Sequence, residues 1–352
     1  MEALGLDSSL YGNIKASRDF TKIAYHILKQ HSGIGLKTFQ LSMFDCNNVD
    51  SCHLDSWLHL ALRLGIEELI LETNSLTSKY NFPLSLLSAK GCLLPDSFAL
   101  ERLELSFCNK IICLKIPRVL LRLSYLEVVA CNYLQVIESE APNLSSFCIR
   151  WFHNHILISL GQALHVKKLE ICSSRAFHYA QLPIIVPSLE TLTIDSISKM
   201  ISTPNAHNKF HQLKYLNIRV PGETHDPTYD YFSLASFLDA SPCLETFILR
   251  VHVQEESPVE HGLFSRDPSH LRQMPEHGHE KLKRVQIGGF YPAKSLLELA
   301  HHVLESATSL ECLALGTTYC SCEFGGKDLG KCYLSAIGTY IEEKVPSTSL
   351  LG

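Results

Sequence analysis

A six-residue pattern, apolar-x-x-apolar-x-apolar, recurs eleven times along this 352-residue chain. Its copies begin at Leu36, Ile66, Leu100, Leu123, Leu144, Val166, Leu189, Leu213, Leu244, Leu282 and Leu310. From Leu100 to Leu213 the copies start 23, 21, 22, 23 and 24 residues apart. An isolated copy carries little information, because any amphipathic helix can produce it. Nearly constant spacing over six consecutive copies instead indicates an internal structural repeat.

The repeat length lies within the roughly 20–29 residues that are typical of leucine-rich repeats. Alternate side chains of a strand point to opposite sides, so the last two apolar residues of each copy point inward together. One repeat cannot bury this apolar face, but stacked neighbours form a continuous core. We therefore predict an α/β leucine-rich-repeat solenoid, with a curved parallel sheet on the concave face and short helices and irregular segments on the convex face. An ordinary α/β domain is the alternative.

A cysteine–asparagine pair follows two of the predicted strands, as Cys108-Asn109 and as Cys131-Asn132. Asn74 stands at the same offset after an earlier strand. Buried turns leave backbone groups that lose free energy unless they are hydrogen-bonded. We predict that these side chains satisfy such groups, so the two cysteines are structural.

Longer spacings between copies predict inserted helices or loops. Apolar residues at helical spacing predict helices over residues 17–31, over Ser233–Ala240 with a serine cap, and over Ala293–Ala307. The expected organisation is an N-terminal helical cap (1–35), leucine-rich repeats (36–250), a polar loop insertion (251–281), and terminal repeats with a C-terminal cap (282–352).

Composition and charge exclude several classes of protein. The net charge of −5 provides no basic surface for phosphates, so we predict no nucleic-acid partner. The chain has no run of about 18 apolar residues, so we predict no membrane partner. The first residues lack the features of a secretory signal, and thirteen cysteines are scattered along the chain. We expect reduced thiols in a cytoplasmic or nuclear protein.

One group of cysteines could suggest a metal site. Cys320 and Cys322, with Cys332 and the pair His301 and His302, lie near each other in the sequence. Zinc sites favour two residues between paired cysteines, and this spacing does not fit. We therefore expect ordinary loop cysteines and no metal site. Four histidines of the polar loop are expected to be hydrated surface residues: His261, His270, His277 and His279.

No catalytic or phosphate-binding motif is recognisable. The stretch Gly33-Ile34-Gly35 lacks the third glycine of a dinucleotide-binding loop. The stretch Gly288-Gly289-Phe290 follows a predicted strand, but no Lys-Ser or Lys-Thr completes a P-loop. The chain also lacks a G-x-S-x-G elbow and an H-E-x-x-H motif. We predict that the protein is not an enzyme and binds no cofactor.

Functional residues are expected on the concave face, where the side chains beside the two inward apolar residues of each strand point outward. Early strands present acidic residues there and later strands present arginines, which we expect to orient a protein partner. Tyr and Arg are enriched at binding hot spots, so Tyr215, Arg219 and Arg250 are the predicted anchors. The alternative is that these charges only solvate the sheet. The predicted protein-binding residues are Glu68, Glu72, Glu104, Tyr125, Glu127, Arg150, Lys168, Tyr215, Arg219, Arg250 and Arg284.

Several segments resemble plant F-box/LRR proteins of the FBD type. Residues 20–33, running into Leu36–Phe39, resemble the segment that follows the F-box in that family. Five further segments resemble the C-terminal FBD-type region of that family: residues 272–277, 282–290, 294–300, 309–313 and 336–347. The resemblance covers nearly all of residues 17–350.

The resemblance implies a substrate-recognition arm of an SCF-type E3 ubiquitin ligase receptor, which binds an unknown protein substrate. An F-box itself is not recognisable, because only about sixteen residues precede the first matching segment and such a module needs roughly forty. A Skp-type adaptor is therefore expected as a partner only if an F-box is supplied upstream. The alternative is an interaction scaffold without an F-box and without a role in ubiquitination.

Overall fold

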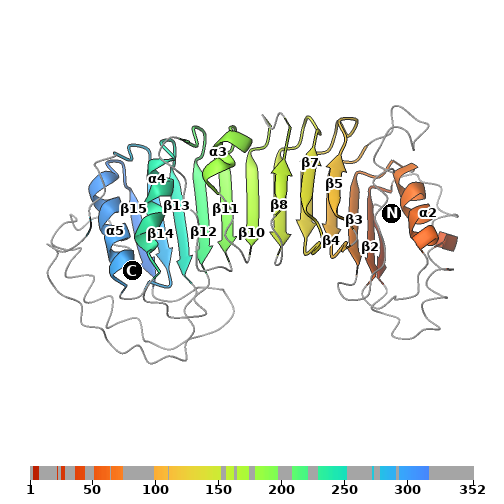
Figure 1. The fold of residues 1–352 in the computed structure, drawn as a ribbon, viewed down its shortest axis with the longest axis horizontal. Coiled ribbons are helices and arrows are strands. Elements are labelled where there is room, and N and C mark those ends of the chain that lie inside the picture. The colour runs from red at the N-terminus through yellow and green to blue at the C-terminus, as the bar shows by residue number, and fades with distance from the viewer. Residues whose placement is uncertain are drawn as a thin grey trace, which may run out of the picture. The chain divides into compact units, whose positions relative to one another are not determined.

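All eleven copies of the repeat pattern coincide with β-strands in the computed structural model (Figure 1). The structure describes residues 3–7, 22, 25–27, 36–43, 51–63, 65–73, 99–109, 111–151, 156–161, 165–173, 179–196, 208–220, 229–251, 272, 278–290 and 293–316. The chain divides into two compact units, Met1–Leu169 and Glu170–Gly352. One strand, β10 (Lys168–Ser173), contains the point of division.

Unit 1 contains a parallel sheet whose strands follow one another in chain order. These strands are β1 (Ala3–Asp7), β2 (Thr38–Met43), β3 (Glu68–Thr73), β4 (Arg102–Ser106), β6 (Tyr125–Val129) and β8 (Ser146–Trp151). The leading strand β1 lies in the region 1–35, where we expected only a helical cap. Strand β1 pairs with β2 through backbone hydrogen bonds, which require no particular side-chain pattern. Its five residues therefore carry no pattern that predicts a strand. Residues 22 and 25–27 are helical, and the rest of the predicted helix 17–31 lies outside the described residues.

Two further elements of unit 1 were not predicted. A second, three-stranded parallel sheet consists of β5 (Cys113–Ile116), β7 (Val136–Ser139) and β9 (Leu157–Ser159). Helix α2 (Ser51–Arg63) fills the long interval between the first two copies of the repeat. It buries Leu54, Trp57, Leu58 and Ala61, whose spacing places them on one helical face.

The apolar residues of the repeat form the core. In the first ten copies the last two apolar positions are buried, as the prediction required. In the final copy the same positions, Leu313 and Leu315, are only half-buried. These residues belong to β15 (Cys312–Gly316), which is the last strand in the sheet order of unit 2.

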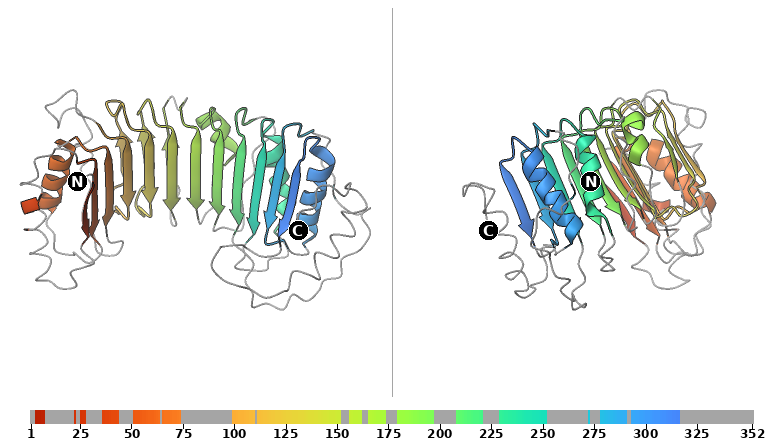
Figure 2. Two further views of the ribbon diagram at one scale, coloured as in Figure 1. Left: turned by 180° about the vertical axis from the view of Figure 1, so that it is seen from behind. Right: turned by 60° about the vertical axis from the view of Figure 1, so that its left-hand side comes forward.

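Unit 2 continues the parallel arrangement with a different covering layer. Its strands are β11 (Thr191–Ser196), β12 (Tyr215–Val220), β13 (Thr246–Val251), β14 (Arg284–Gly288) and β15. Its helical segments are η2 (Tyr179–Gln181), α3 (Leu182–Ile185), η3 (Tyr231–Leu234), α4 (Ala235–Asp239) and α5 (Lys294–Ser306). Helices α4 and α5 cover one face of strands β13–β15, and the opposite face has no described helix in front of it (Figure 2).

The predicted helix over Ala293–Ala307 is confirmed as α5, to within one residue at each end. The predicted helix at Ser233–Ala240 also forms, but it begins with the η3 turn and its serine cap is wrong. The Ser233 hydroxyl donates a 2.7 Å hydrogen bond to the carbonyl of Asp230 and does not accept one from a backbone amide of the helix. The predicted polar loop 251–281 lies mostly outside the described residues, as do residues 317–352, which contain Cys320, Cys322 and Cys332.

Candidate protein-binding surface

In unit 1, outward-facing side chains line up in rows across neighbouring strands. The parallel register places Glu68 beside Arg102 and Arg102 beside Tyr125. The next row places Glu104 directly beside Glu127. Side chains opposite each other on adjacent strands interact directly, so each row behaves as one extended surface.

Arg102 organises the centre of this unit 1 face. Its guanidinium lies over the ring of Tyr125, 3.8 Å from the ring centroid, and its Nε donates to a carboxylate oxygen of Glu104. The hydroxyl of Tyr125 donates to Glu127, and Arg150 lies 3.9 Å from the same carboxylate. Burial and the bond to Glu127 raise the pKa of Tyr125, so its hydroxyl remains a donor. The paired acids Glu104 and Glu127 are therefore each compensated by a neighbour.

The two remaining acids among the predicted binding residues of unit 1 accept hydrogen bonds from hydroxyl groups. Glu68 accepts a 2.8 Å hydrogen bond from the hydroxyl of Thr38, and Glu72 accepts one of the same length from Ser42. Hydroxyl donors fix the position of a carboxylate without neutralising it. The predicted residues of unit 1 thus form an ordered acidic and aromatic patch on β3, β4, β6 and β8.

In unit 2, the predicted anchors also converge. The register places Arg219 beside Arg250 on adjacent strands, and Tyr215 lies four residues before Arg219 on the same face of β12. Arg219 lies 3.8 Å from Asp195, and Arg250 donates a 3.2 Å hydrogen bond to the side chain of Asn217. The two guanidinium groups thus lie together on one face of β12 and β13.

The row that contains the two arginines continues without side chains. Arg250 is in register with Gly288, and Gly288 is in register with Gly316. The neighbouring row ends on Gln286 and Ala314. The row of Arg219 and Arg250 therefore carries no side chain where it crosses β14 and β15.

For two predicted residues, no side-chain contact is described. Arg284 is exposed on β14, in register with Thr246. Lys168 is exposed at the start of β10, where the chain divides into its two units. The structure therefore groups the remaining nine predicted residues into a patch in each unit.

Not every outward position is accessible. Cys148 and Asn217 occupy the middle of their strands, on the face expected to point to solvent, yet only 4% and 5% of their surfaces are exposed. Longer side chains of the flanking rows cover this middle position, as the bond from Arg250 to Asn217 shows. Binding is thus expected to depend on the outer rows.

The turn cysteines are structural, as predicted. The Cys131 thiol lies 3.6 Å from the carbonyl of Leu105 and 3.5 Å from that of Val129. The side-chain oxygen of Asn109 accepts a 2.8 Å hydrogen bond from the amide of Asn132 in the next repeat. Hydrogen bonding with Cys131 and burial raise the pKa of the Cys108 thiol. Asn74 lies outside the described residues.

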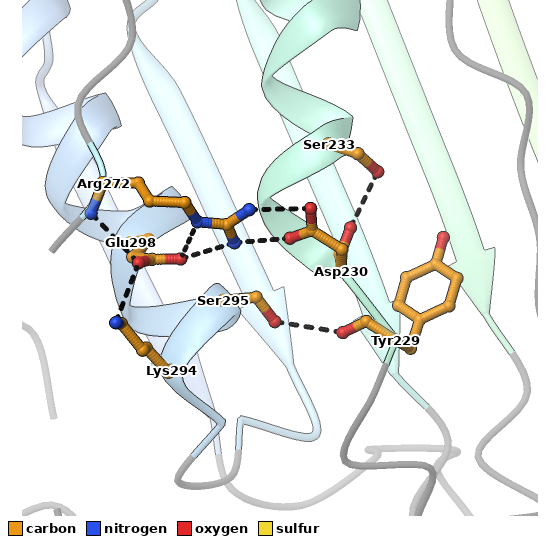
Figure 3. A network of polar contacts seen from close by, with 7 residues as sticks. All are labelled: Tyr229, Asp230, Ser233, Arg272, Lys294, Ser295 and Glu298. Carbon is orange, nitrogen blue, oxygen red and sulfur yellow. Dashed lines mark hydrogen bonds and ion pairs between the residues drawn. The ribbon is translucent and has the colours of Figure 1, made fainter.

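A polar network anchors the segment that precedes β14 (Figure 3). Arg272 donates to both oxygens of Asp230, at 2.9 and 2.6 Å, and to Glu298 at 2.9 and 2.6 Å. Its backbone amide donates a further 3.0 Å bond to Glu298, whose side chain is fully buried in α5. The guanidinium of Arg272 also lowers the pKa of Asp230. One arginine thus connects η3 to α5 within unit 2.

The histidines of this region are not where the sequence suggested. We expected His279 to be a hydrated surface residue, but it is buried, and so are His301 and His302 of α5. Burial follows from packing of α4 and α5 against the segment before β14, which the polar composition of residues 251–281 did not reveal. His261, His270 and His277 lie outside the described residues.

Comparison with known families identifies one match. The profile described as "At1g61320/AtMIF1, LRR domain" matches residues 27–92 and 90–352 of this chain. No curated protein matches. No described helix is long and apolar enough to cross a membrane.

Proposed function

Because the chain belongs to the leucine-rich-repeat domain family described as At1g61320/AtMIF1, we propose that it is the substrate-recognition arm of an SCF-type ubiquitin ligase receptor. A leucine-rich-repeat domain is a protein-binding module, and the described strands present ordered side chains on one face. The ubiquitin link rests on the resemblance of residues 20–33, 272–277, 282–290, 294–300, 309–313 and 336–347 to F-box/LRR proteins of the FBD type. The protein binds its substrate and does not catalyse a reaction.

The adjacent arginines of unit 2 are the observation that carries the binding role. Arg219 and Arg250 face the same side in register, with Tyr215 nearby and with glycines continuing their row. Burying two neighbouring guanidinium groups requires acidic partners, because an unpaired buried charge is costly. The partner is therefore a protein segment rich in Asp or Glu.

The proposed location is the cytoplasm or the nucleus. The eight cysteines among the described residues are all free thiols, and four of them are buried. Free thiols are usual in reducing compartments, whereas secreted proteins of this cysteine content form disulfides. Ligase receptors of the proposed kind act in those compartments.

Charge reversal at Arg219 and Arg250 is expected to abolish binding of the substrate. The double variant Arg219→Glu/Arg250→Glu replaces attraction for an acidic segment by repulsion, which we expect to weaken affinity by at least ~100-fold. Pull-down with quantitative mass spectrometry, comparing each variant with the unchanged chain, measures the loss. The control Lys209→Glu/Lys283→Glu makes the same charge change at exposed residues outside the strands of unit 2. Equal binding by both double variants would show that Arg219 and Arg250 are not part of the binding surface.

An adaptor-binding assay distinguishes the two proposed functions, the substrate-recognition arm of a ubiquitin ligase and an interaction scaffold. The 352-residue chain is compared with a version extended by an upstream F-box, using a purified Skp-type adaptor. We expect only the extended version to bind the adaptor. Both versions should bind the substrate through Arg219 and Arg250. Binding of neither version would favour an interaction scaffold without a role in ubiquitination.

A further inference from the structure

Three potential metal ligands from distant parts of the sequence converge inside unit 2. Asp239 is the last residue of α4, His279 precedes β14, and His302 lies in α5. One ligand atom from each residue lies within 4.8 Å of the other two. Both histidines are 7% exposed, so the cluster is an interior feature of the unit.

The distances within this Asp239–His279–His302 cluster fit a tetrahedral ion. The Nε2 atoms of the two histidines are 3.3 Å apart, and Nε2 of His279 lies 3.6 Å from Oδ1 of Asp239. Two nitrogen ligands about 2.05 Å from a tetrahedral zinc ion are separated by about 3.3 Å. A nitrogen and a carboxylate oxygen at usual zinc distances are separated by about 3.4 Å. Two of the three ligand–ligand distances are therefore close to those of a tetrahedral zinc ion, and the third is within 4.8 Å.

The two imidazole rings are held in place by groups that do not belong to the cluster. The backbone amide of His279 donates a 2.8 Å hydrogen bond to the carbonyl of Ser306, at the end of α5. The ring of Phe232 packs edge-on against His302, with 6.1 Å between ring centroids. Preorganised ligands lose little conformational entropy when an ion binds.

A small hollow adjoins the cluster at His279. His279 lines a small hollow together with Leu238, Ser241, Pro242 and Leu282. The Ser241 hydroxyl is buried and has no hydrogen-bond partner among the described residues. The hollow has no room for a water molecule in this structure, so among the described residues only Asp239, His279 and His302 supply ligand atoms.

We propose that Asp239, His279 and His302 form a zinc site that ties α4, the segment before β14 and α5 together. Two imidazoles and one carboxylate suit a borderline transition-metal ion, whereas calcium and magnesium require oxygen ligands. A hydrogen bond between two neutral imidazoles explains the 3.3 Å contact alone. It does not explain the carboxylate of Asp239, whose Oδ1 lies 3.6 Å from the same Nε2 atom of His279.

Zinc titration of the full chain tests this site. Protein stripped with a chelator is titrated with zinc against a chromophoric competitor, and bound metal is counted by mass spectrometry. We expect tight binding of zinc to the unchanged chain and a loss of at least ~100-fold in that affinity for His279→Gln and for His302→Gln. The matched control is His301→Gln, since His301 is equally buried in α5 but points to Glu305, 3.2 Å away. This control is expected to retain the affinity.

Cobalt provides a readout that does not depend on the folding of a variant. Cobalt bound to the unchanged chain should show the visible bands of a tetrahedral site without a sulfur-to-cobalt charge-transfer band. A strong charge-transfer band would assign the metal to cysteines instead and overturn the proposal. Zinc binding that is absent in the unchanged chain, or that is unaffected in both histidine variants, would overturn it as well.

Discussion

Replacing Gly289 with alanine is expected to lower the free energy of unfolding of unit 2 by about 3–5 kcal/mol, combining backbone strain with overpacking. Gly289 follows β14 with φ of +69°, a conformation that residues with a Cβ atom rarely adopt. An added Cβ would lie 1.8 Å from the carbonyl oxygen of Val251 and 2.9 Å from its carbonyl carbon. Backbone atoms of a central strand cannot move aside, so the strand pair β13–β14 must open.

Urea unfolding followed by circular dichroism measures this effect. The matched control is Gly65→Ala, because Gly65 has a similar φ of +74° but nothing within 4 Å of an added Cβ. We expect the free energy of unfolding of the control variant to fall by only ~1 kcal/mol, because its added Cβ causes backbone strain alone. Equal losses in the two variants would show that the close approach of Val251 contributes nothing.

Replacing Arg272 with methionine is expected to destabilise unit 2 by about 3 kcal/mol, the lower end of the cost of breaking a buried ion pair. The reason is Glu298, whose side chain is fully buried and bonds to Nε and Nη2 of Arg272. Without the guanidinium, the partners that this carboxylate keeps among the described residues are the backbone amide of residue 272 and Lys294, whose Nζ is 3.9 Å away. A buried charge with so few partners is costly.

Two further variants identify the cause of that loss. Arg272→Met/Glu298→Leu removes both charges, so we expect it to recover part of the stability in urea unfolding. Arg219→Met removes an arginine whose ion pair with Asp195 is about 40% exposed on both sides, and it should cost less than ~1 kcal/mol. A double variant that is less stable than Arg272→Met would contradict the buried-charge explanation.

The repeat register could be read from the sequence because it depends on local periodicity. Residues such as Leu216 and Ile218 alternate with polar neighbours, and a parallel strand buries one side of that alternation. The same logic identified the outward positions of Arg219 and Arg250. Spacing alone placed these residues on one face, and the structure added that they are direct neighbours.

Helices and strands outside the repeat were predicted less well from the sequence, because they do not follow its periodic pattern. Helix α2 has a clear apolar stripe at Leu54, Trp57, Leu58 and Ala61, which a systematic search for helical spacing could have detected. Strand β1 is five residues long and depends on backbone bonds to β2. The sheet β5–β7–β9 consists of short strands of three or four residues, whose pairing depends on the stacking of repeats.

The sequence by itself determined the leucine-rich-repeat fold, the buried positions of each strand and the face on which the charged residues lie, because all three follow from a periodic pattern. Only the tertiary structure brought His279 to Asp239 and His302, and Arg272 to Asp230 and Glu298. These partners are 23 to 42 residues apart. Contacts over such separations arise from the packing of helices onto the sheet, and no local spacing of residues encodes them.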